Sequence, residues 1–368
     1  MTEREPLSEV HEIACSSCGA TLEFSPGTSR LKCRYCGAEN EIETASDSAI
    51  EEFDYHAFLR KQEADEGGME ETHTVACSSC GATTTLLPNV TADNCPFCAT
   101  PFVVQADHTT RRLKPRYMLP FSVVHNDAVR FFETWIAKRW FAPGNLKRYA
   151  TDRDRICGLY IPYWTYDSST NSVYTGQRGT NHTQSYSTVV NGRRVTQTRV
   201  VIHWRRVHGS VSRFFDDVLI VASRSLPEKY AARLEPWDLE HLEAYNPSYC
   251  AGFRSEAYGV GLDEGFEKAK QTMEKTIRED VRRDIGGDHQ RITSLQTAYH
   301  DITFKHILLP IWLSAYRYKG KVYRFMVNGR TGEVQGERPW SIVKITLAVA
   351  AGAAAVAAAW CLLHPYFR

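Results

Sequence analysis

The sequence carries almost no net charge and lacks the common motifs of nucleotide-binding proteins and hydrolases. Its 44 basic side chains (Lys and Arg) nearly balance its 43 acidic ones, so no overall basic field indicates a nucleic-acid partner. The patterns G-x-x-x-x-G-K-[ST], G-x-G-x-x-G, G-x-S-x-G and H-E-x-x-H are all absent. No motif therefore indicates catalysis, and we expect a protein that is not an enzyme.

The amino-terminal segment lacks the apolar run of a secretory signal peptide. Met1–Val10 is charged, so we expect the cysteines to stay reduced inside the cell rather than form a disulfide framework. A thioredoxin-like redox function is also disfavoured, because no βαβ pattern surrounds the C-x-x-C pairs. Metal binding is the role that remains for most of the 11 cysteines.

Eight cysteines form four C-x-x-C pairs with the spacing of metal ligands. The pattern C-x2-C-x14-C-x2-C occurs twice, with an offset of 62 residues. Each pair places two thiolates on a tight turn, and two such turns complete the tetrahedral shell of a structural Zn²⁺ site. The predicted zinc ligands are Cys15, Cys18, Cys33 and Cys36 in one site, and Cys77, Cys80, Cys95 and Cys98 in the other.

The two cysteine sets belong to an internal duplication. Residues 11–21 match residues 73–83 at most positions, and Pro26 corresponds to Pro88. We predict zinc ribbon 1 over residues 11–42 and zinc ribbon 2 over residues 73–104. The acidic residues 43–72 are predicted to form a linker with a short helix near residues 50–62, and a peptide-binding acidic helix is the alternative.

A run of 19 residues without a charge, Ile345–Leu363, lies near the carboxyl terminus. At 1.5 Å per residue it is just long enough to cross a hydrocarbon core of about 30 Å. Trp340 and Trp360 flank it at the positions of the two membrane interfaces. A buried alanine-rich helix of a soluble core is the alternative. We predict a transmembrane helix over residues 342–363.

Basic residues predict the orientation of this helix. Only Arg368 follows it, whereas several basic residues precede it: Lys319, Lys321, Arg324, Arg330, Arg338 and Lys344. Because basic residues are retained on the cytoplasmic side, the amino-terminal bulk is expected in the cytoplasm. The protein would then be a single-pass, tail-anchored protein of the inner (cytoplasmic) membrane.

Residues 109–335 are predicted to form an α+β domain with a mostly antiparallel sheet. One helix is expected after Asn126 or Asp127, either of which can cap it, and a longer amphipathic helix from Asp263 to Ile285. Strands are expected at Tyr160–Tyr166, Asp217–Ala222, Ile302–Tyr318 and Val322–Val327. The whole chain is thus assigned to the α+β class, with two amino-terminal zinc ribbons and one transmembrane helix.

A β-hairpin is predicted around Asn191-Gly192, because this dipeptide between two long runs is a strong hairpin signal. Its arginines are Arg193, Arg194, Arg199, Arg205 and Arg206. Such a ribbon could contact phosphates or anionic headgroups. We favour the simpler interpretation of a solvated hairpin whose charges discourage edge pairing.

Other polar residues carry little chemical signal. Asp216 and Asp217 are adjacent in a predicted strand, so they should point to opposite faces and share neither a proton nor a metal. Cys157, Cys250 and Cys361 have no partner at ligand spacing, and we interpret them as unreactive thiols.

Two family resemblances add to this reading. Cys15–Cys36, with Pro26 and Gly27 between its pairs, resembles the LSD subclass of plant-type zinc ribbons, which is associated with protein–protein and DNA contacts. Ribbon 2 keeps Pro88 but has Asn89 in place of Gly27.

Nearly the whole chain resembles a bacterial family of tail-anchored zinc-ribbon membrane proteins that often carry the name primosomal protein N′ or replication-restart helicase. The motifs that carry the resemblance are Tyr160–Tyr166, Ser225–Pro227, Leu234–Trp237, Ile285–Ile292, Phe304–Trp312 and Val327–Val334. The resemblance implies a membrane protein that recruits a cytoplasmic partner, since relatives are encoded beside phage-shock (PspA-type) envelope-stress proteins and SPFH-domain proteins. Unwinding of DNA would need a phosphate-binding loop, which this sequence lacks.

Three functions follow as hypotheses. The first is a membrane-anchored zinc-ribbon adaptor that recruits a cytoplasmic protein in an envelope-stress response. The second is a zinc-dependent nucleic-acid-binding protein, for which the arginines at 193–206 could contribute phosphate contacts; ribbon 1 offers the basic residues Arg30, Lys32 and Arg34, and ribbon 2 offers almost none. The third is a membrane-linked enzyme with a site in residues 109–335, for which the sequence provides no motif.

Overall fold

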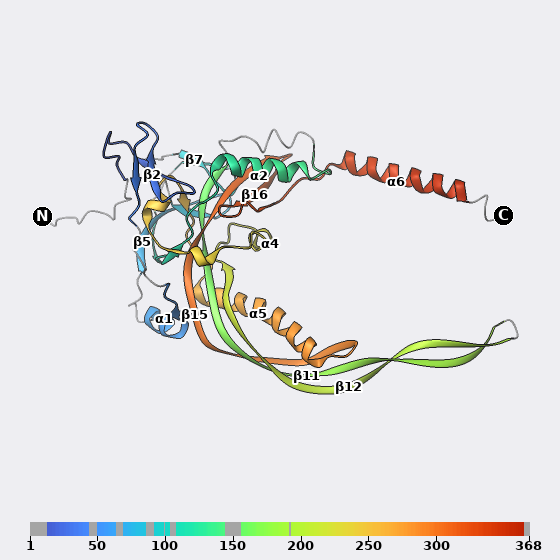
Figure 1. Ribbon diagram of the computed structural model, residues 1–368. Coiled ribbons are helices and arrows are strands. Elements are labelled where there is room, and N and C mark those ends of the chain that lie inside the picture. The colour runs from blue at the N-terminus through green and yellow to red at the C-terminus, as the bar shows by residue number, and fades with distance from the viewer. Residues whose placement is uncertain are drawn as a thin grey trace.

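The computed structural model describes residues 13–43, 50–63, 69–85, 92–98, 100–103, 108–143, 156–190 and 193–363 of the chain. Three very long strands form the axis of the molecule (Figure 1). β11 (Cys157–Val190) pairs in antiparallel fashion with β12 (Arg193–Val221) on one side and β15 (His289–Tyr318) on the other. The predicted α+β class with a mostly antiparallel sheet is confirmed.

Short strands complete this central sheet around one half of the long strands. The antiparallel additions are β4 (Phe53–Asp54), β13 (Glu243–Ala244), β16 (Lys321–Asn328) and β17 (Val334–Gly336). Two strands pair in parallel, β10 (Tyr117–Met118) with β15 and β14 (Arg254–Ser255) with β11. The other half of β11 and β12 extends away from the body (Figure 1).

Each ribbon adds small sheets of its own. Ribbon 1 contains β1 (Leu22–Ser25), β2 (Arg30–Cys33) and β3 (Glu39–Glu41) in one antiparallel sheet. Ribbon 2 contains β5 (Met69–Ala76) and β6 (Thr83–Thr85), joined by β9 (His108–Leu113), and a separate pair formed by β7 (Ala92–Asn94) and β8 (Pro101–Val103). The duplicated sequence therefore forms two ribbons with different strand partners.

The helices lie against the central sheet or project from it. They are α1 (Tyr55–Glu63), α2 (His125–Ala137), α4 (Glu228–Ala231), α5 (Leu262–Ile285) and α6 (Ile342–Leu363), with short 3-10 turns η2 (Leu239–His241) and η3 (Pro247–Cys250). α5 confirms the predicted helix and buries its apolar stripe. The predicted cap of α2 was wrong, because Val124 occupies the N-cap position and Asn126 and Asp127 lie in the first turn.

The strands are longer than the sequence pattern indicated. Asp217–Ala222 was predicted as a separate strand, but residues 217–221 are the end of β12, and β15 begins at His289 rather than Ile302. The polar residues of these extensions lack apolar alternation, and the hydrogen-bonded ladder across β12, β11 and β15 keeps them extended. The predicted Asn191-Gly192 turn lies outside the described residues.

Residues 50–63 of the acidic segment 43–72 fold onto the central sheet, whereas residues 69–72 are part of β5 and pair with β9. Phe53 and Asp54 of β4 pair with Phe304 and Thr303 of β15, and α1 follows directly as the predicted short helix. The rings of Phe58 and Phe304 lie 5.1 Å apart. Residues 50–63 are therefore part of the body, and the side chain of Glu52 contacts Thr303 and Lys305 of the sheet.

Two apolar cores cover opposite faces of the sheet. Tyr160, Leu308 and Trp312 point into one core, which also contains Phe132 of α2, whereas Leu159 and Ile311 point into the other. The alternation of side chains along a strand explains this division. A third core forms where α5 covers the long strands.

Candidate metal centres

The four predicted cysteines of ribbon 1 meet at one point. Two knuckles hold them, each closed by a backbone hydrogen bond to a cysteine carbonyl, from Gly19 to Cys15 at 2.8 Å and from Gly37 to Cys33 at 3.1 Å. Both glycines have a positive φ (+74° and +76°), which residues with a side chain rarely adopt. The repeated Cys-x-x-Cys-Gly sequence thus builds the two halves of the site by local turn geometry.

Ribbon 2 brings its four cysteines together in the same way. The Gly81 amide donates to the Cys77 carbonyl at 2.8 Å, and φ at Gly81 is +74°. On the second knuckle, the Cys95 amide donates to the Thr100 carbonyl at 3.0 Å. The structure therefore gathers all eight predicted site residues into two clusters of four.

The sulfur spacing suits a metal ion better than a disulfide. The Cys15 and Cys36 sulfurs lie 3.5 Å apart and those of Cys18 and Cys33 lie 3.6 Å apart. In ribbon 2 the corresponding distances are 3.6 Å for Cys77–Cys98 and 3.7 Å for Cys80–Cys95. Four sulfurs placed tetrahedrally at 2.3 Å from an ion are separated by about 3.8 Å, whereas a disulfide needs about 2.05 Å. In each cluster all four ligand atoms lie within 4.8 Å of one another.

Hydrogen bonds lower the pKa of a thiol in each cluster, although the pKa values of Cys36, Cys80 and Cys95 are raised. Backbone N–H groups of Cys36 and Tyr35 lower the pKa of Cys33 to about 6. Burial raises the pKa of Cys98, but hydrogen bonds with the Thr100 hydroxyl and backbone outweigh it and lower this pKa to about 6. Each cluster thus has one thiol that ionises readily near neutral pH, and thiolates are the form that binds metals.

The two clusters differ in exposure. In ribbon 1, Cys18 and Cys36 are exposed, and the side chain of Tyr35 between the second pair of cysteines is 85% exposed. In ribbon 2, Cys95 and Cys98 are buried, and Phe97, which corresponds to Tyr35, is completely buried. Arg324 of β16 donates a hydrogen bond to the Phe97 carbonyl, so the central sheet covers this knuckle.

The ribbons sit on opposite faces of the central sheet. Leu22 and Phe24 of ribbon 1 belong to the core that contains Tyr160, and the rings of Phe24 and Tyr249 meet edge to face at 5.1 Å. Cys95 and Phe97 of ribbon 2 belong to the core of Leu159 and Ile311. The two ribbons therefore pack against opposite faces of one sheet, because alternate residues of each strand point to opposite faces.

Sequence reasoning missed a cluster of charges around a buried lysine. The side chain of Lys305 is 5% exposed, and its Nζ lies 2.7 Å from Asp217 and 2.9 Å from Glu52, with Asp167 at 3.9 Å. Burial lowers the pKa of Lys305, but these carboxylates outweigh it and raise it. Glu52, Asp167 and Asp216 also bring carboxylate oxygens within 4.8 Å of one another. A lone lysine in the apolar strand 302–313 was the available signal.

The strand alternation expected at Asp216 and Asp217 is interrupted. β12 and β11 shift register between Tyr166 and Ser168, so both aspartates lie opposite Asp167, and Asp217 has φ +49°. A β-bulge of this kind ends the strict alternation of side chains. Both carboxylates therefore reach the cluster around Lys305.

Two of the remaining cysteines are half-buried and unreactive. Burial raises the pKa of both Cys157 and Cys250 to about 12, which leaves the thiols protonated at neutral pH. The Cys157 sulfur lies 3.5 Å from the Leu313 carbonyl. The side chain of Cys361 lies outside those that the structure describes.

α6 is long and apolar enough to span a membrane. Residues 342–360 have a mean hydropathy of 2.0, and none of this stretch is buried against the rest of the protein. Its start is fixed to the body, because Lys344 donates hydrogen bonds to the carbonyls of Trp140 and Ala142 at 2.9 and 2.8 Å. Trp140 and Trp340 are both exposed near this start, and Trp360 is exposed near the other end.

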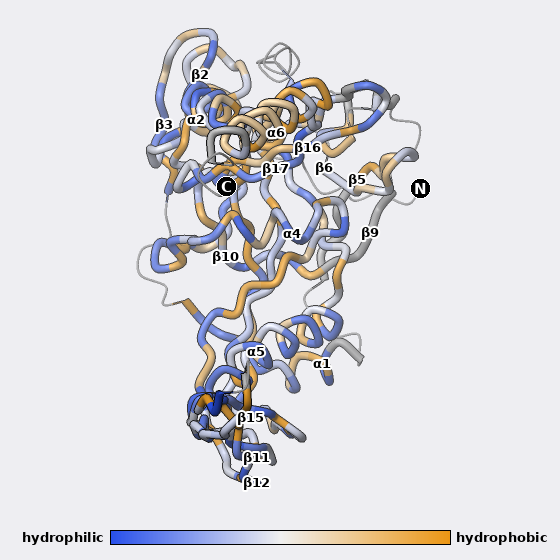
Figure 2. Tube along the Cα trace, turned by 90° about the vertical axis from the view of Figure 1, so that its right-hand side faces the viewer, coloured by the Kyte–Doolittle hydropathy of each residue, from blue (hydrophilic) through white to orange (hydrophobic). Residues whose placement is uncertain are grey.

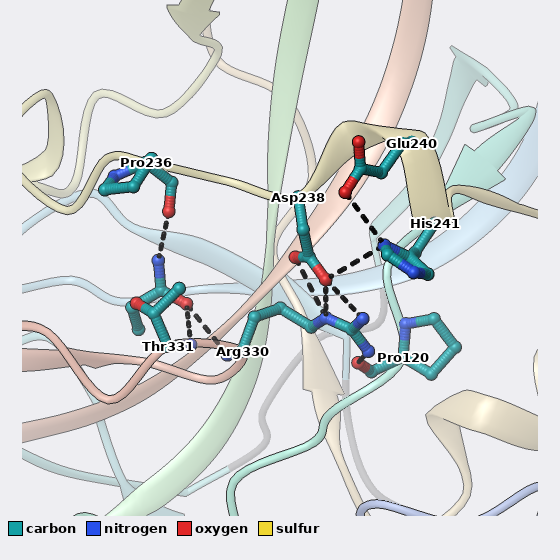
Figure 3. A network of polar contacts seen from close by, with 8 residues as sticks. Pro120, Pro236, Asp238, Glu240, His241, Arg330 and Thr331 are labelled. Atoms are coloured by element: carbon teal, nitrogen blue, oxygen red, sulfur yellow. Dashed lines mark hydrogen bonds and ion pairs between the residues drawn. The ribbon is translucent and has the colours of Figure 1, made fainter.

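Two of the motifs quoted for the family resemblance meet in space (Figure 3). Asn328 is completely buried, and its side-chain Nδ2 donates a hydrogen bond to the Leu234 carbonyl at 2.8 Å. The side-chain Oδ1 of Asn328 accepts a hydrogen bond from the Arg330 backbone amide. The Arg330 guanidinium holds both oxygens of Asp238 and the Pro120 carbonyl. These contacts join segments 234–238 and 328–331, so both motifs stabilise the fold in the described structure.

The comparisons with known proteins reveal one similarity across most of the chain. The chain is 26% identical over 337 residues to a protein of Bacillus subtilis (strain 168) described as "Uncharacterized protein YdjG", covering 90% of this chain and 91% of that protein. The chain matches no protein-family model, and no solved structure matches it. The similarity spans nearly the full length of both chains, and the printed name assigns no activity.

Proposed function

We propose that this protein is a membrane-anchored zinc-ribbon adaptor that recruits a cytoplasmic protein partner through ribbon 1 and is not an enzyme. The observation that carries the proposal is the difference between the duplicated knuckles. Phe97 of ribbon 2 is completely buried, while Tyr35 of ribbon 1 is 85% exposed. An exposed aromatic on a rigid turn is the kind of residue that anchors protein interfaces.

Zinc is the metal we assign to both clusters. Soft thiolate ligands select zinc among the common divalent ions, and the sulfur distances of 3.5–3.7 Å fit its tetrahedral geometry. The ligands would be Cys15, Cys18, Cys33 and Cys36, and Cys77, Cys80, Cys95 and Cys98. Four protein ligands leave no open position for substrate, so zinc would hold each ribbon together without catalysing a reaction.

The proposed anchor is α6. The stretch Ile342–Trp360, at 1.5 Å per residue, covers about 28 Å, close to the thickness of a hydrocarbon core of about 30 Å. The exposed Trp140 and Trp340 near one end and Trp360 near the other would then lie in the two interfaces. The excess of basic residues before the helix supports an orientation with ribbon 1 on the cytoplasmic side of the inner membrane.

The family resemblance suggests the partner and the setting. Relatives encoded beside PspA-type and SPFH-domain proteins make such a protein the expected partner, and an envelope-stress response the expected pathway. Nucleic acid is the less supported partner of ribbon 1. Arg30, Lys32 and Arg34 form ion pairs with three glutamates of the same ribbon, which neutralise the positive charge that phosphates would need; these are Glu23, Glu39 and Glu41.

The test is affinity purification of the full chain from detergent-solubilised membranes, with and without nuclease. We expect about two zinc ions per chain and a stoichiometric protein partner that resists nuclease. Tyr35→Ser should abolish capture while zinc content and membrane retention stay unchanged. Phe214→Ser, an exposed apolar residue of β12, is the matched control and should retain the partner.

Two results would contradict this function. Full capture by Tyr35→Ser would exclude ribbon 1 as the recognition surface. A catch of nucleic acid that disappears on nuclease treatment would favour the nucleic-acid hypothesis instead.

A further inference from the structure

The free end of the long hairpin is a two-stranded ribbon that no other described element covers. β15 pairs with β11 only as far as the Gly179–His289 pair, whereas β11 and β12 continue to the Val190–Arg193 pair. Residues 180–190 and 193–203 therefore project from the body (Figure 1). Together with residues 204–206 at their base, which lie opposite β11 residues that β15 also pairs, they are here named the basic arm. Ten residues beyond Thr180 extend the arm by about 33 Å at 3.3 Å per residue.

The arm carries positive charge without acidic residues. The sequence contains seven arginines and no aspartate or glutamate between residues 168 and 215. Five arginines of the arm are exposed, and no ion pair links them to an acidic side chain of the described residues; they are Arg193, Arg194, Arg199, Arg205 and Arg206. The two arginines nearer the body are different. Arg213 pairs with Asp280 of α5, and Arg178 lies beside Gly286 and Gly287.

Exposed apolar side chains lie among these arginines. Val189 and Val200 are each 64% exposed, and Tyr186 is 43% exposed. Val189 is directly opposite Arg194 on one face of the ribbon, and Tyr186 stacks beneath Arg199 on the other, 5.7 Å from the ring centre to the guanidinium. Both faces therefore combine cations with apolar groups, a combination that suits the headgroup layer of a membrane.

The arm and α6 leave the body on the same side. Both extend away from the amino-terminal side in Figure 1, and both point toward the viewer in Figure 2. A bilayer crossed by α6 would therefore face the arm. In Figure 1 the arm runs alongside α6 toward the far end of that helix. A two-stranded ribbon has unpaired backbone groups along its edges and cannot cross hydrocarbon, so the arm would have to bend relative to α6 to lie along the surface.

We propose that the basic arm binds the surface of a bilayer that contains anionic phospholipids. The proposal rests on the membrane anchoring proposed for α6 and adds a second, electrostatic contact with the same membrane. Phosphates of the headgroups would accept hydrogen bonds from the exposed arginines, while Val189, Val200 and Tyr186 enter the interface. A single-stranded nucleic acid also presents phosphates, but its binding would not explain why the arm and α6 extend from the same side of the body.

The experiment compares hydrogen exchange of the full chain in two kinds of vesicle, phosphatidylcholine alone and phosphatidylcholine with phosphatidylglycerol. We expect amides of residues 180–206 to exchange several-fold more slowly in the anionic vesicles, and this protection to disappear at high salt. Each arginine replaced should weaken the contact about five-fold, so Arg193→Gln/Arg194→Gln/Arg199→Gln should abolish the protection.

A matched control removes the same charge elsewhere. Arg60→Gln/Lys61→Gln/Arg233→Gln changes three exposed cations outside the arm and should keep the protection. Equal exchange of the wild-type arm in both vesicles would overturn the proposal. Protection by added single-stranded DNA in neutral vesicles, without protection by phosphatidylglycerol, would also overturn it and assign the arm to nucleic acid.

Failure of the anchor would be visible separately. Carbonate washing releases a chain whose α6 is not inserted, and such release contradicts the anchor. For a released chain, flotation with added phosphatidylglycerol vesicles tests the arm on its own. Flotation of the wild-type chain that the triple arginine variant loses would support membrane binding by the arm. If the wild-type chain does not float, both the proposed binding by the arm and the proposed anchor are overturned.

Discussion

Ribbon 1 and ribbon 2 share a sequence pattern and a sulfur geometry, but they differ in what surrounds them. The second knuckle of ribbon 1 is open to solvent at Tyr35, and the equivalent knuckle of ribbon 2 lies under the central sheet at Phe97. A duplicated unit thus serves as a surface in one copy and as part of the core in the other. The spacing of the cysteines therefore specifies the local cluster in both copies. The residue between the second pair of cysteines depends on what the turn contacts: it is Tyr35 where the turn faces solvent and Phe97 where the turn packs in the core.

The largest expected effect is loss of a metal ligand in the buried copy. Cys98→Ser should remove one zinc ion and on the order of 10 kcal/mol of local folding free energy. Because Cys98 lies in the core beside the central sheet, amide hydrogen exchange should become faster across β11 and β15. Cys36→Ser, at the equivalent exposed position, should remove one zinc and raise exchange in ribbon 1 alone. Zinc analysis and hydrogen exchange check both, with Cys157→Ser as a control that keeps two zinc ions. Equal effects on the central sheet would remove the distinction between the ribbons.

Substitution of the aromatic residue between the second pair of cysteines tests whether this turn is exposed in ribbon 1 and buried in ribbon 2. Phe97→Ala should lower the free energy of unfolding by about 3–5 kcal/mol, because it leaves a cavity in a closed core. Tyr35→Ala should change it by less than about 0.5 kcal/mol, since the side chain is exposed. Denaturant titration of both variants provides the measurement. A large cost for Tyr35→Ala would mean that this ring is packed and is not a free recognition surface.

Ion pairs follow the same division. Lys305 is buried among carboxylates on the sheet face that ribbon 2 covers, and Lys305→Met should cost about 3–5 kcal/mol because it leaves those charges without a cation. Arg30 of ribbon 1 is half exposed in its pairs with Glu39 and Glu41, and Arg30→Met should cost less than about 1 kcal/mol. Thermal or denaturant unfolding checks the pair of variants, and similar costs would contradict the assigned burial.

The smallest effect is a dependence of stability on pH at Asp167. Burial and the hydrogen bond with Glu52 raise the pKa of Asp167 to about 7, from an ordinary 3.8. Between these values the folded state keeps a proton that the unfolded chain releases, so this carboxyl makes stability fall as pH rises from about 4 to about 7. Asp167→Asn should remove that part of the fall relative to wild type, measured as the denaturant midpoint at about pH 5 and about pH 8. An unchanged difference would show that Asp167 is ionised throughout.

Local patterns were sufficient for several elements of the fold. The two clusters of four cysteines, α5 and α6 all follow from spacing or periodicity within a few tens of residues, and the structure confirms their positions. The long polar extensions of β11, β12 and β15 could not be predicted from hydrophobic alternation. Backbone pairing with neighbouring strands stabilises them, and they have no apolar face that would show in the sequence. The N-cap of α2 failed for a related reason, since the chain enters this helix from the contact of Val123 with Trp312.

The sequence by itself determined that four thiolates would gather at each of two sites, because Cys-x-x-Cys turns and positive-φ glycines act over a few residues. It also determined the apolar length of α6. Contacts in the tertiary structure bury one knuckle and leave the other exposed. They also bring Asp217 to Lys305 and Asp216 to Glu52 and Asp167 at a β-bulge, and they direct the basic arm and α6 to the same side of the body. These features depend on contacts between segments far apart in the chain, such as Phe97 with Arg324 and Glu52 with Lys305, which local patterns do not encode.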